Sequence, residues 1–191
     1  AKFHTVNWQN SVDDTYTNEQ LHNIFKKINK YILSGLQGTN YPISYKEQSD
    51  LLVQYLKMFK GEQYNPENIY NSSDFIGPSS ITLQIANIAP INPNTNIVNI
   101  RENYTVTDKA DGDRKLLFIG PSGKIYLITT LLNIEFTGAE TKNKELFNSL
   151  LDGEHIKHNI KGQFINLYAA FDIYFRNNKD IRELNFVPET S

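Results

Sequence analysis

The chain has 191 residues, of which 39% are apolar and 21% charged, and its formal net charge is −2. These values are typical of a globular protein and exclude a disordered or strongly basic one, so any polyanion must be held by a local basic patch. Cysteine is absent, which excludes disulfides, thiolate metal sites and cysteine nucleophiles. No apolar run approaches the roughly 20 residues that span a bilayer, and we expect no membrane contact.

Two amphipathic helices are predicted near the N-terminus. Thr17 with Gln20, or alternatively Asn18, is expected to cap a first helix, whose apolar residues recur at helical spacing. A second helix is predicted over residues 45–60, with its apolar residues on one face. We expect residues 1–72 to form a helical segment, either separate from the domain of residues 73–191 or part of it.

The remainder of the chain predicts an antiparallel sheet. Residues 64–80 are rich in Asn, Ser, Pro and Gly, the composition of a connecting loop. The fold class is therefore α+β, an antiparallel sheet with a few helices. Strands are predicted over residues 81–88, 96–100, 104–108, 115–119, 124–130, 150–156 and 163–175, with a helix near residues 143–150.

The most informative segment has the pattern Lys-x-Asp-Gly-x-Arg. Lys109 lies at the end of a predicted strand and precedes Asp111, Gly112 and Arg114. Gly112 permits a tight turn and a close approach of the backbone to a ligand. Taken alone, this segment is equally compatible with a solvated turn that carries charges.

A lysine acts as a nucleophile only after it loses its proton. Neighbouring cations or desolvation lower a lysine pKa and favour this loss. Arg114, Lys115 and Lys124 are expected to supply such a field around Lys109, and Asp111 is expected to orient the amine. The same basic cluster would bind a triphosphate.

Two further segments follow in order. Asp152-Gly153-Glu154 lies on a predicted strand, and Phe171-Asp172 lies within the next apolar strand. The order, spacing and strand context of the three segments resemble the covalent nucleotidyltransferase superfamily of mRNA capping enzymes and ATP-dependent DNA and RNA ligases.

Within that superfamily, the chain resembles the guanylyltransferase domain of capping enzymes of large cytoplasmic DNA viruses. Residues 77–83, Gly-Pro-Ser-Ser-Ile-Thr-Leu, resemble the segment that precedes the first motif in capping enzymes. Residues 180–186 resemble a segment shared by capping enzymes and ligases, so they do not discriminate. The resemblance implies that Lys109 takes GMP from GTP with Mg²⁺ or Mn²⁺, and passes it to the diphosphate 5′ end of RNA.

The resemblance also implies roles for single residues. Asp111 and Gly112 belong to the nucleotide-binding motif, Arg114 and Glu154 match contacts to the ribose, and Phe171 matches the aromatic residue that stacks on the base. The alternatives are a surface carboxylate for Glu154 and a core residue for Phe171. An aromatic face accepts any base, so Phe171 does not select guanine over adenine. No metal ligands are identified.

The chain departs from the family pattern in two places. An arginine expected in residues 126–130 is missing, and the family's later motifs, expected beyond Phe186, do not appear before Ser191. We therefore expect a fragment of a longer polypeptide, fused to or associated with RNA triphosphatase and cap methyltransferase domains. A cytoplasmic location is expected, in a viral factory or virion if the protein is viral.

Two alternative functions remain open. The first is an ATP-dependent DNA or RNA ligase that adenylates the same lysine, because the shared motifs do not separate GTP from ATP. The second is a non-catalytic interaction module that retains the motifs.

Overall fold

The protein is described by a computed structural model that covers residues 16–61, 64–65, 70–102 and 104–185. The chain forms two compact units, which divide between Pro42 and Ile43.

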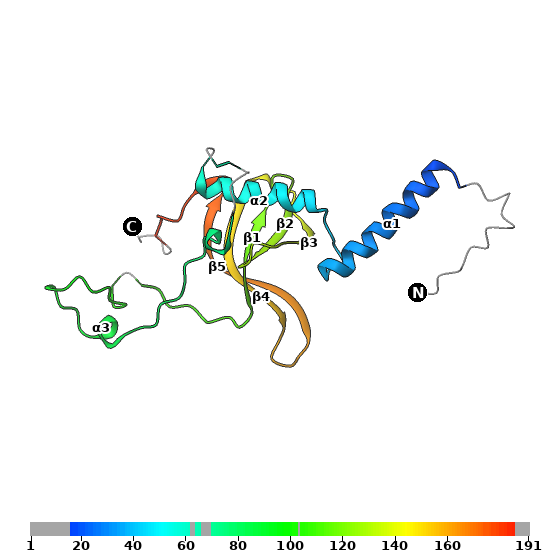
Figure 1. Ribbon diagram of the computed structural model, residues 1–191. Coiled ribbons are helices and arrows are strands. Elements are labelled where there is room, and N and C mark those ends of the chain that lie inside the picture. The colour runs from blue at the N-terminus through cyan, green and yellow to red at the C-terminus, as the bar shows by residue number, and fades with distance from the viewer. Residues whose placement is uncertain (1–15, 62–63, 66–69, 103, 186–191) are drawn as a thin grey trace. The chain divides into compact units, whose positions relative to one another are not determined.

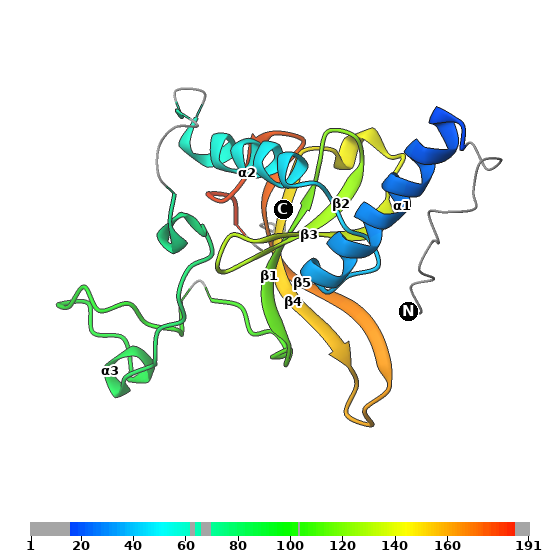
Figure 2. The ribbon, with the colours of Figure 1, turned by 45° about the vertical axis from the view of Figure 1, so that its right-hand side comes forward.

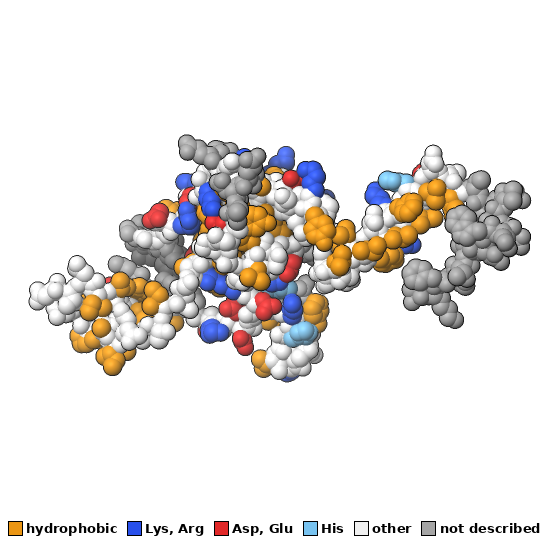
Figure 3. Space-filling model, viewed as in Figure 1, with side chains coloured by type: hydrophobic (Ala, Val, Ile, Leu, Met, Phe, Trp, Pro, Cys, Tyr) orange, Lys and Arg blue, Asp and Glu red, His pale blue; other side chains and the backbone are white. Residues whose placement is uncertain are grey.

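The first unit contains α1 (Asn18–Gln37). Its predicted capping pair is confirmed, because the Thr17 hydroxyl accepts from the Gln20 amide and the Gln20 side chain accepts from the Thr17 amide. The apolar side chains lie along one face of α1 (Figure 3), and they include Phe25 with 61% of its surface exposed.

The second unit is built on an antiparallel sheet of six strands in the described part of the chain, in the order β3-β2-β1-β4-β5-β6 (Figure 1). The first three strands and the last three each follow one another as neighbours, whereas the chain crosses from β3 at the sheet edge to β4, which pairs with β1. The strands are β1 (Asp113–Ile119), β2 (Lys124–Thr129), β3 (Ile134–Glu140), β4 (Ser149–His158), β5 (Phe164–Arg176) and β6 (Lys179–Asp180).

One face of the sheet is covered by α2 (Tyr45–Lys60), as Figure 2 shows. Leu56 of α2 and Leu116 of β1 are completely buried in the same apolar core. The burial of this apolar stripe explains why α2 forms a compact unit with the sheet. The domain boundary expected near residue 72 stays a prediction.

The strands predicted over residues 81–88, 96–100 and 104–108 are wrong. Where the structure describes this region, it contains one short helix, α3 (Ile85–Ile88), and otherwise irregular backbone. Its apolar side chains are largely exposed, among them Val106 with 98% of its surface exposed.

Asparagine side chains form hydrogen bonds to the backbone around α3. The Asn87 amide donates to the Val98 carbonyl at 2.8 Å, and the Asn99 amide donates to the Ala89 carbonyl at 2.8 Å. These bonds join residues 11 and 10 positions apart, and the alternation of apolar residues did not reveal them.

Other predicted elements also differ from those in the structure. The helix predicted near residues 143–150 is only the 3-10 turn η2 (Lys144–Leu146), and β4 begins at Ser149. β3 was not predicted, whereas β1, β2, β4 and β5 confirm the other predicted strands. A second 3-10 turn, η1 (Ser72–Asp74), follows α2 in the sequence. Among the described residues, no helix combines the length and apolar character needed to cross a bilayer.

Candidate functional site

The structure places the first and second sequence motifs side by side. β1 and β4 are antiparallel neighbours, and Arg114 lies opposite Glu154 in their register. The Arg114 guanidinium donates to both oxygens of Asp152, from Nε to Oδ1 at 3.2 Å and from Nη2 to Oδ2 at 2.5 Å. Asp152 is completely buried. Its hydrogen bond raises the pKa of Arg114, so the arginine keeps its charge.

A tyrosine completes the environment of Asp152. The Tyr174 hydroxyl donates to Asp152 Oδ2 at 2.5 Å, and burial raises the pKa of Tyr174, which keeps this donor protonated. The hydrogen bonds from Arg114 and Tyr174 compensate the buried carboxylate for its lost hydration. Asp152 is therefore the anchor of Arg114, a role that its place in the second motif did not reveal.

The opposite side of Arg114 is closed by residues 75–78. Arg114 Nη1 donates to the Pro78 carbonyl at 2.6 Å, and the Phe75 ring lies under the guanidinium, 5.7 Å from Cζ to the ring centroid. A Cβ atom on Gly77 would lie 2.6 Å from Arg114 Nη2, so only glycine fits there without a shift. The residues that resemble the segment before the first motif thus contact the arginine of that motif.

Lys109 has a different setting. Residues 104–112 carry no regular secondary structure, and the exposed Lys109 side chain donates from Nζ to the Ala110 carbonyl at 3.1 Å. Asp111 is exposed as well. A Cβ on Gly112 would lie 2.8 Å from the His155 carbonyl oxygen, so this glycine allows the backbone to pass close to β4.

The basic field expected around Lys109 is not found. Arg114 is paired with Asp152, as described above. Lys115 Nζ lies 2.6 Å from Glu135, and Lys124 Nζ lies 3.1 Å from Glu47. Lys124 also begins β2 at the far end of the hairpin, about 20 Å from Arg114 along a strand of seven residues. The three residues are close along the chain, which led to the expectation of a cluster. The extended strand β1 carries the chain away from Arg114 before Lys124 is reached.

Glu154 and Phe171 differ in their exposure. Glu154 is half-buried, and its Oε2 is enclosed with no hydrogen-bond partner among the described residues. Such an atom is unusual in a native protein, where buried polar groups have hydrogen-bond partners. Phe171 is 38% exposed and lies at a register shift of β5, so it is not a fully buried core residue.

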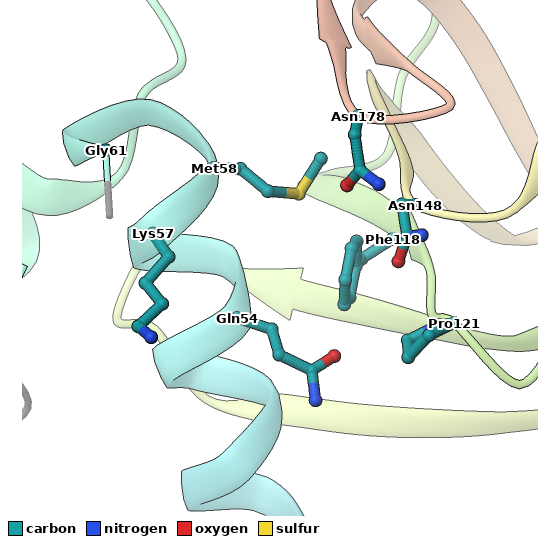
Figure 4. Close-up of a pocket in the computed structure, with 8 residues that line it drawn as sticks. All are labelled: Gln54, Lys57, Met58, Gly61, Phe118, Pro121, Asn148 and Asn178. Atoms are coloured by element: carbon teal, nitrogen blue, oxygen red, sulfur yellow. The ribbon is translucent and has the colours of Figure 1, made fainter.

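A hollow of about 560 Å³ lies elsewhere, between α2 and the end of β1 that is remote from Arg114 (Figure 4). It contains none of the motif residues. The side chains that line it include Gln54, Met58, Phe118 and Asn178. The candidate site is therefore defined by the motif residues rather than by this cavity.

A comparison with known families decides the assignment. The family model described as "mRNA capping enzyme, catalytic domain" matches residues 47–189, from the first turn of α2 to the end of the sheet and beyond. The chain belongs to the mRNA capping enzyme family. This result confirms the resemblance inferred from the three motifs, and it confirms the α+β fold class.

Two capping enzyme relatives are similar to the chain. A "Probable mRNA-capping enzyme" of Acanthamoeba polyphaga mimivirus is 31% identical over 173 residues, which are 91% of this chain and 12% of the relative. An "mRNA-capping enzyme" of Danio rerio is 27% identical over 123 residues, which are 61% of this chain and 19% of the relative. The chain thus spans a minor part of the length of either relative.

Proposed function

We propose that this capping enzyme chain takes part in mRNA guanylyl transfer, with Lys109 as the residue that carries GMP. One observation supports this most directly. Arg114 of the Lys-x-Asp-Gly-x-Arg segment is paired with Asp152 and lies opposite Glu154, both from the Asp-Gly-Glu segment. Arg114 of the first motif therefore lies beside the second motif, which is distant in sequence, within a chain matched by the capping catalytic domain.

The proposed reaction has two steps. The deprotonated Lys109 Nζ attacks the α-phosphorus of GTP, a P–N bond forms, the bond to the β-phosphate breaks, and pyrophosphate leaves. A terminal oxygen of a 5′-diphosphate RNA then attacks the same phosphorus, the P–N bond breaks, and the amine is restored. The protein contributes position and charge stabilisation to both steps.

The contacts of Arg114 leave capacity for a nucleotide. A guanidinium has five N–H donors, and three of them are used by Asp152 and Pro78. The side chain is 30% exposed, so the remaining donors are open to a ribose hydroxyl. We assign the other ribose contact to Glu154, because its Oε2 has no partner in the described residues. Phe171 would stack on the base with its exposed ring.

Mg²⁺ is the expected metal. The described residues contain no group of three or more acidic or histidine side chains that could hold an ion by themselves. Mg²⁺ or Mn²⁺ would bind through substrate phosphates, waters and one or two carboxylates, and the exposed Asp111 fits that donor set. The ion would neutralise charge on the leaving pyrophosphate.

We further propose that the chain works together with RNA triphosphatase and cap methyltransferase activities, fused or associated. The support is that the viral relative is much longer than the part this chain matches. That relative also supports a viral protein, which would act in the host cytoplasm, in a viral factory or in the virion.

The test is covalent labelling with Mg²⁺ and α-labelled GTP or ATP in parallel, on this chain and on the full product of its gene. Lys109→Ala is the active-site variant, and Lys161→Ala is the matched control, an exposed lysine at the tip of the β4–β5 hairpin. An acid-labile adduct with GTP that Lys109→Ala loses supports the proposal. An adduct with ATP alone assigns the protein to the ligases, and no adduct in either protein replaces the proposal with a non-catalytic interaction module.

A further inference from the structure

Tyr55, in the middle of α2, holds two backbone groups of the segment that covers Arg114. Its hydroxyl donates to the Asp74 carbonyl at 2.7 Å and accepts from the Ile76 amide at 3.0 Å. The side chain is completely buried, and burial raises the pKa of Tyr55, so the hydroxyl remains a donor. One side chain thus fixes the path of the backbone on either side of Phe75.

The same segment has a second anchor on α2. Lys60 Nζ lies 2.5 Å from the Asp74 carboxylate, whose side chain is only 12% exposed. Within this segment, the Phe75 ring and the Pro78 carbonyl contact the Arg114 guanidinium. A continuous series of contacts therefore leads from the buried face of α2 to the candidate ribose contact.

We propose that Tyr55 is a positioning residue for Arg114, which acts by fixing residues 74–78 against the guanidinium. Asp152 holds Arg114 from one side, and the segment held by Tyr55 closes the other side. Without the hydroxyl, the Pro78 carbonyl and the Phe75 ring lose their fixed place, and the guanidinium can turn away from the nucleotide. This inference rests on the proposed function of Arg114.

The matched control is Tyr126. Its hydroxyl also connects α2 to the sheet, because it donates to Glu47 Oε1 at 2.9 Å, and its ring is also buried. It lies in the β2 strand opposite Phe118, toward the end of β1 remote from Arg114. Tyr126→Phe therefore removes a comparable bond without touching the segment at Arg114.

The first measurement is the GTP concentration that gives half-maximal labelling. Loss of a hydrogen bond worth about 1 kcal/mol predicts a rise of about fivefold for Tyr55→Phe, with a smaller change in the maximal rate, and no rise for Tyr126→Phe. A double-mutant cycle with Arg114→Lys then identifies the route. Tyr55→Phe should add little in the Arg114→Lys background, whereas an equal rise in both backgrounds would overturn the proposal.

The second measurement needs no nucleotide. The Arg114 Nε–H group is bonded to Asp152, and its NMR signal can be assigned by its loss in Arg114→Lys. Its hydrogen exchange should accelerate several-fold in Tyr55→Phe and stay unchanged in Tyr126→Phe. Unchanged exchange in Tyr55→Phe would overturn the inference. If the wild-type protein forms no adduct, the proposed function fails, and this exchange measurement still decides whether Tyr55 positions Arg114.

Discussion

Lys109 and Arg114 belong to one sequence motif, yet the protein treats them in opposite ways. Arg114 is held by a buried carboxylate, by a backbone carbonyl and by an aromatic ring. Lys109 is exposed on a segment without regular secondary structure. The part of the site that would bind the nucleotide is thus built into the core, whereas the proposed nucleophile is not. Substitutions at the two positions should therefore separate chemistry from stability.

The sharpest separation is expected for Lys109→Ala. We expect complete loss of the covalent adduct, because no other group would replace the attacking amine. The free energy of unfolding should change by no more than about 0.5 kcal/mol, since the side chain is exposed and its hydrogen bond goes to the neighbouring Ala110 carbonyl. Labelling and urea denaturation of the same sample measure both quantities. A large loss of stability would contradict the contrast with Arg114.

A substitution in α2 tests how much this helix contributes to the stability of the unit that contains Arg114. Leu56→Ala should reduce the free energy of unfolding by about 4 kcal/mol, because Leu56 is completely buried between α2 and the sheet. The matched control is Leu36→Ala in α1, where the leucine is 69% exposed and the change should stay below about 0.5 kcal/mol. Equal effects in urea denaturation would show that α2 is not part of the core.

The contrast also explains what the sequence could predict. Periodicity located α1, α2 and most strands, and the order of the motifs led to the family. Asn87 and Asn99 were missed as organisers of an irregular segment, because their hydrogen bonds depend on residues distant in the chain. The pairing of Lys124 with Glu47 was missed for the same reason.

For the site, the sequence identified Arg114. It did not identify Tyr55 and Lys60, the two α2 residues that hold the segment next to Arg114. Tyr55 follows the helical period of an ordinary core residue, so nothing in its spacing indicates hydrogen bonds to residues 74–76. The proposed roles of Glu154 and Phe171 stay predictions, because they concern a nucleotide that the protein alone does not display.

The ion pair between Arg114 and Asp152 should contribute more to the free energy of unfolding than an ion pair on the surface. Asp152→Asn should cost about 3 kcal/mol of stability, because it leaves the charge of Arg114 without its partner and alters a completely buried site. The control is Asp180→Asn, which breaks an Arg182 pair of 2.6 Å whose carboxylate side chain is 44% exposed, and should cost less than about 1 kcal/mol. Denaturant titration of both variants measures the difference, and equal losses would show that burial adds nothing at Arg114.

The smallest expected effect concerns the tyrosine that donates to Asp152. Tyr174→Phe should reduce stability by about 1.5 kcal/mol at pH 8, since it removes a hydrogen bond to a charged acceptor. Burial raises the pKa of Tyr174 above the ordinary value of 10.0. The contribution of the hydroxyl is therefore complete below pH 10 and is lost as the pH rises, because the unfolded chain ionises first.

The wild-type protein should lose about 1.4 kcal/mol from this tyrosine by one pH unit above 10, whereas Tyr174→Phe loses none of it. The two stability curves, measured by urea denaturation between pH 8 and 11, should consequently converge. A gap that stays constant over this range would mean that the Tyr174 hydroxyl is not buried against Asp152. The rigid setting of Arg114 would then depend on the carboxylate and residues 74–78 alone.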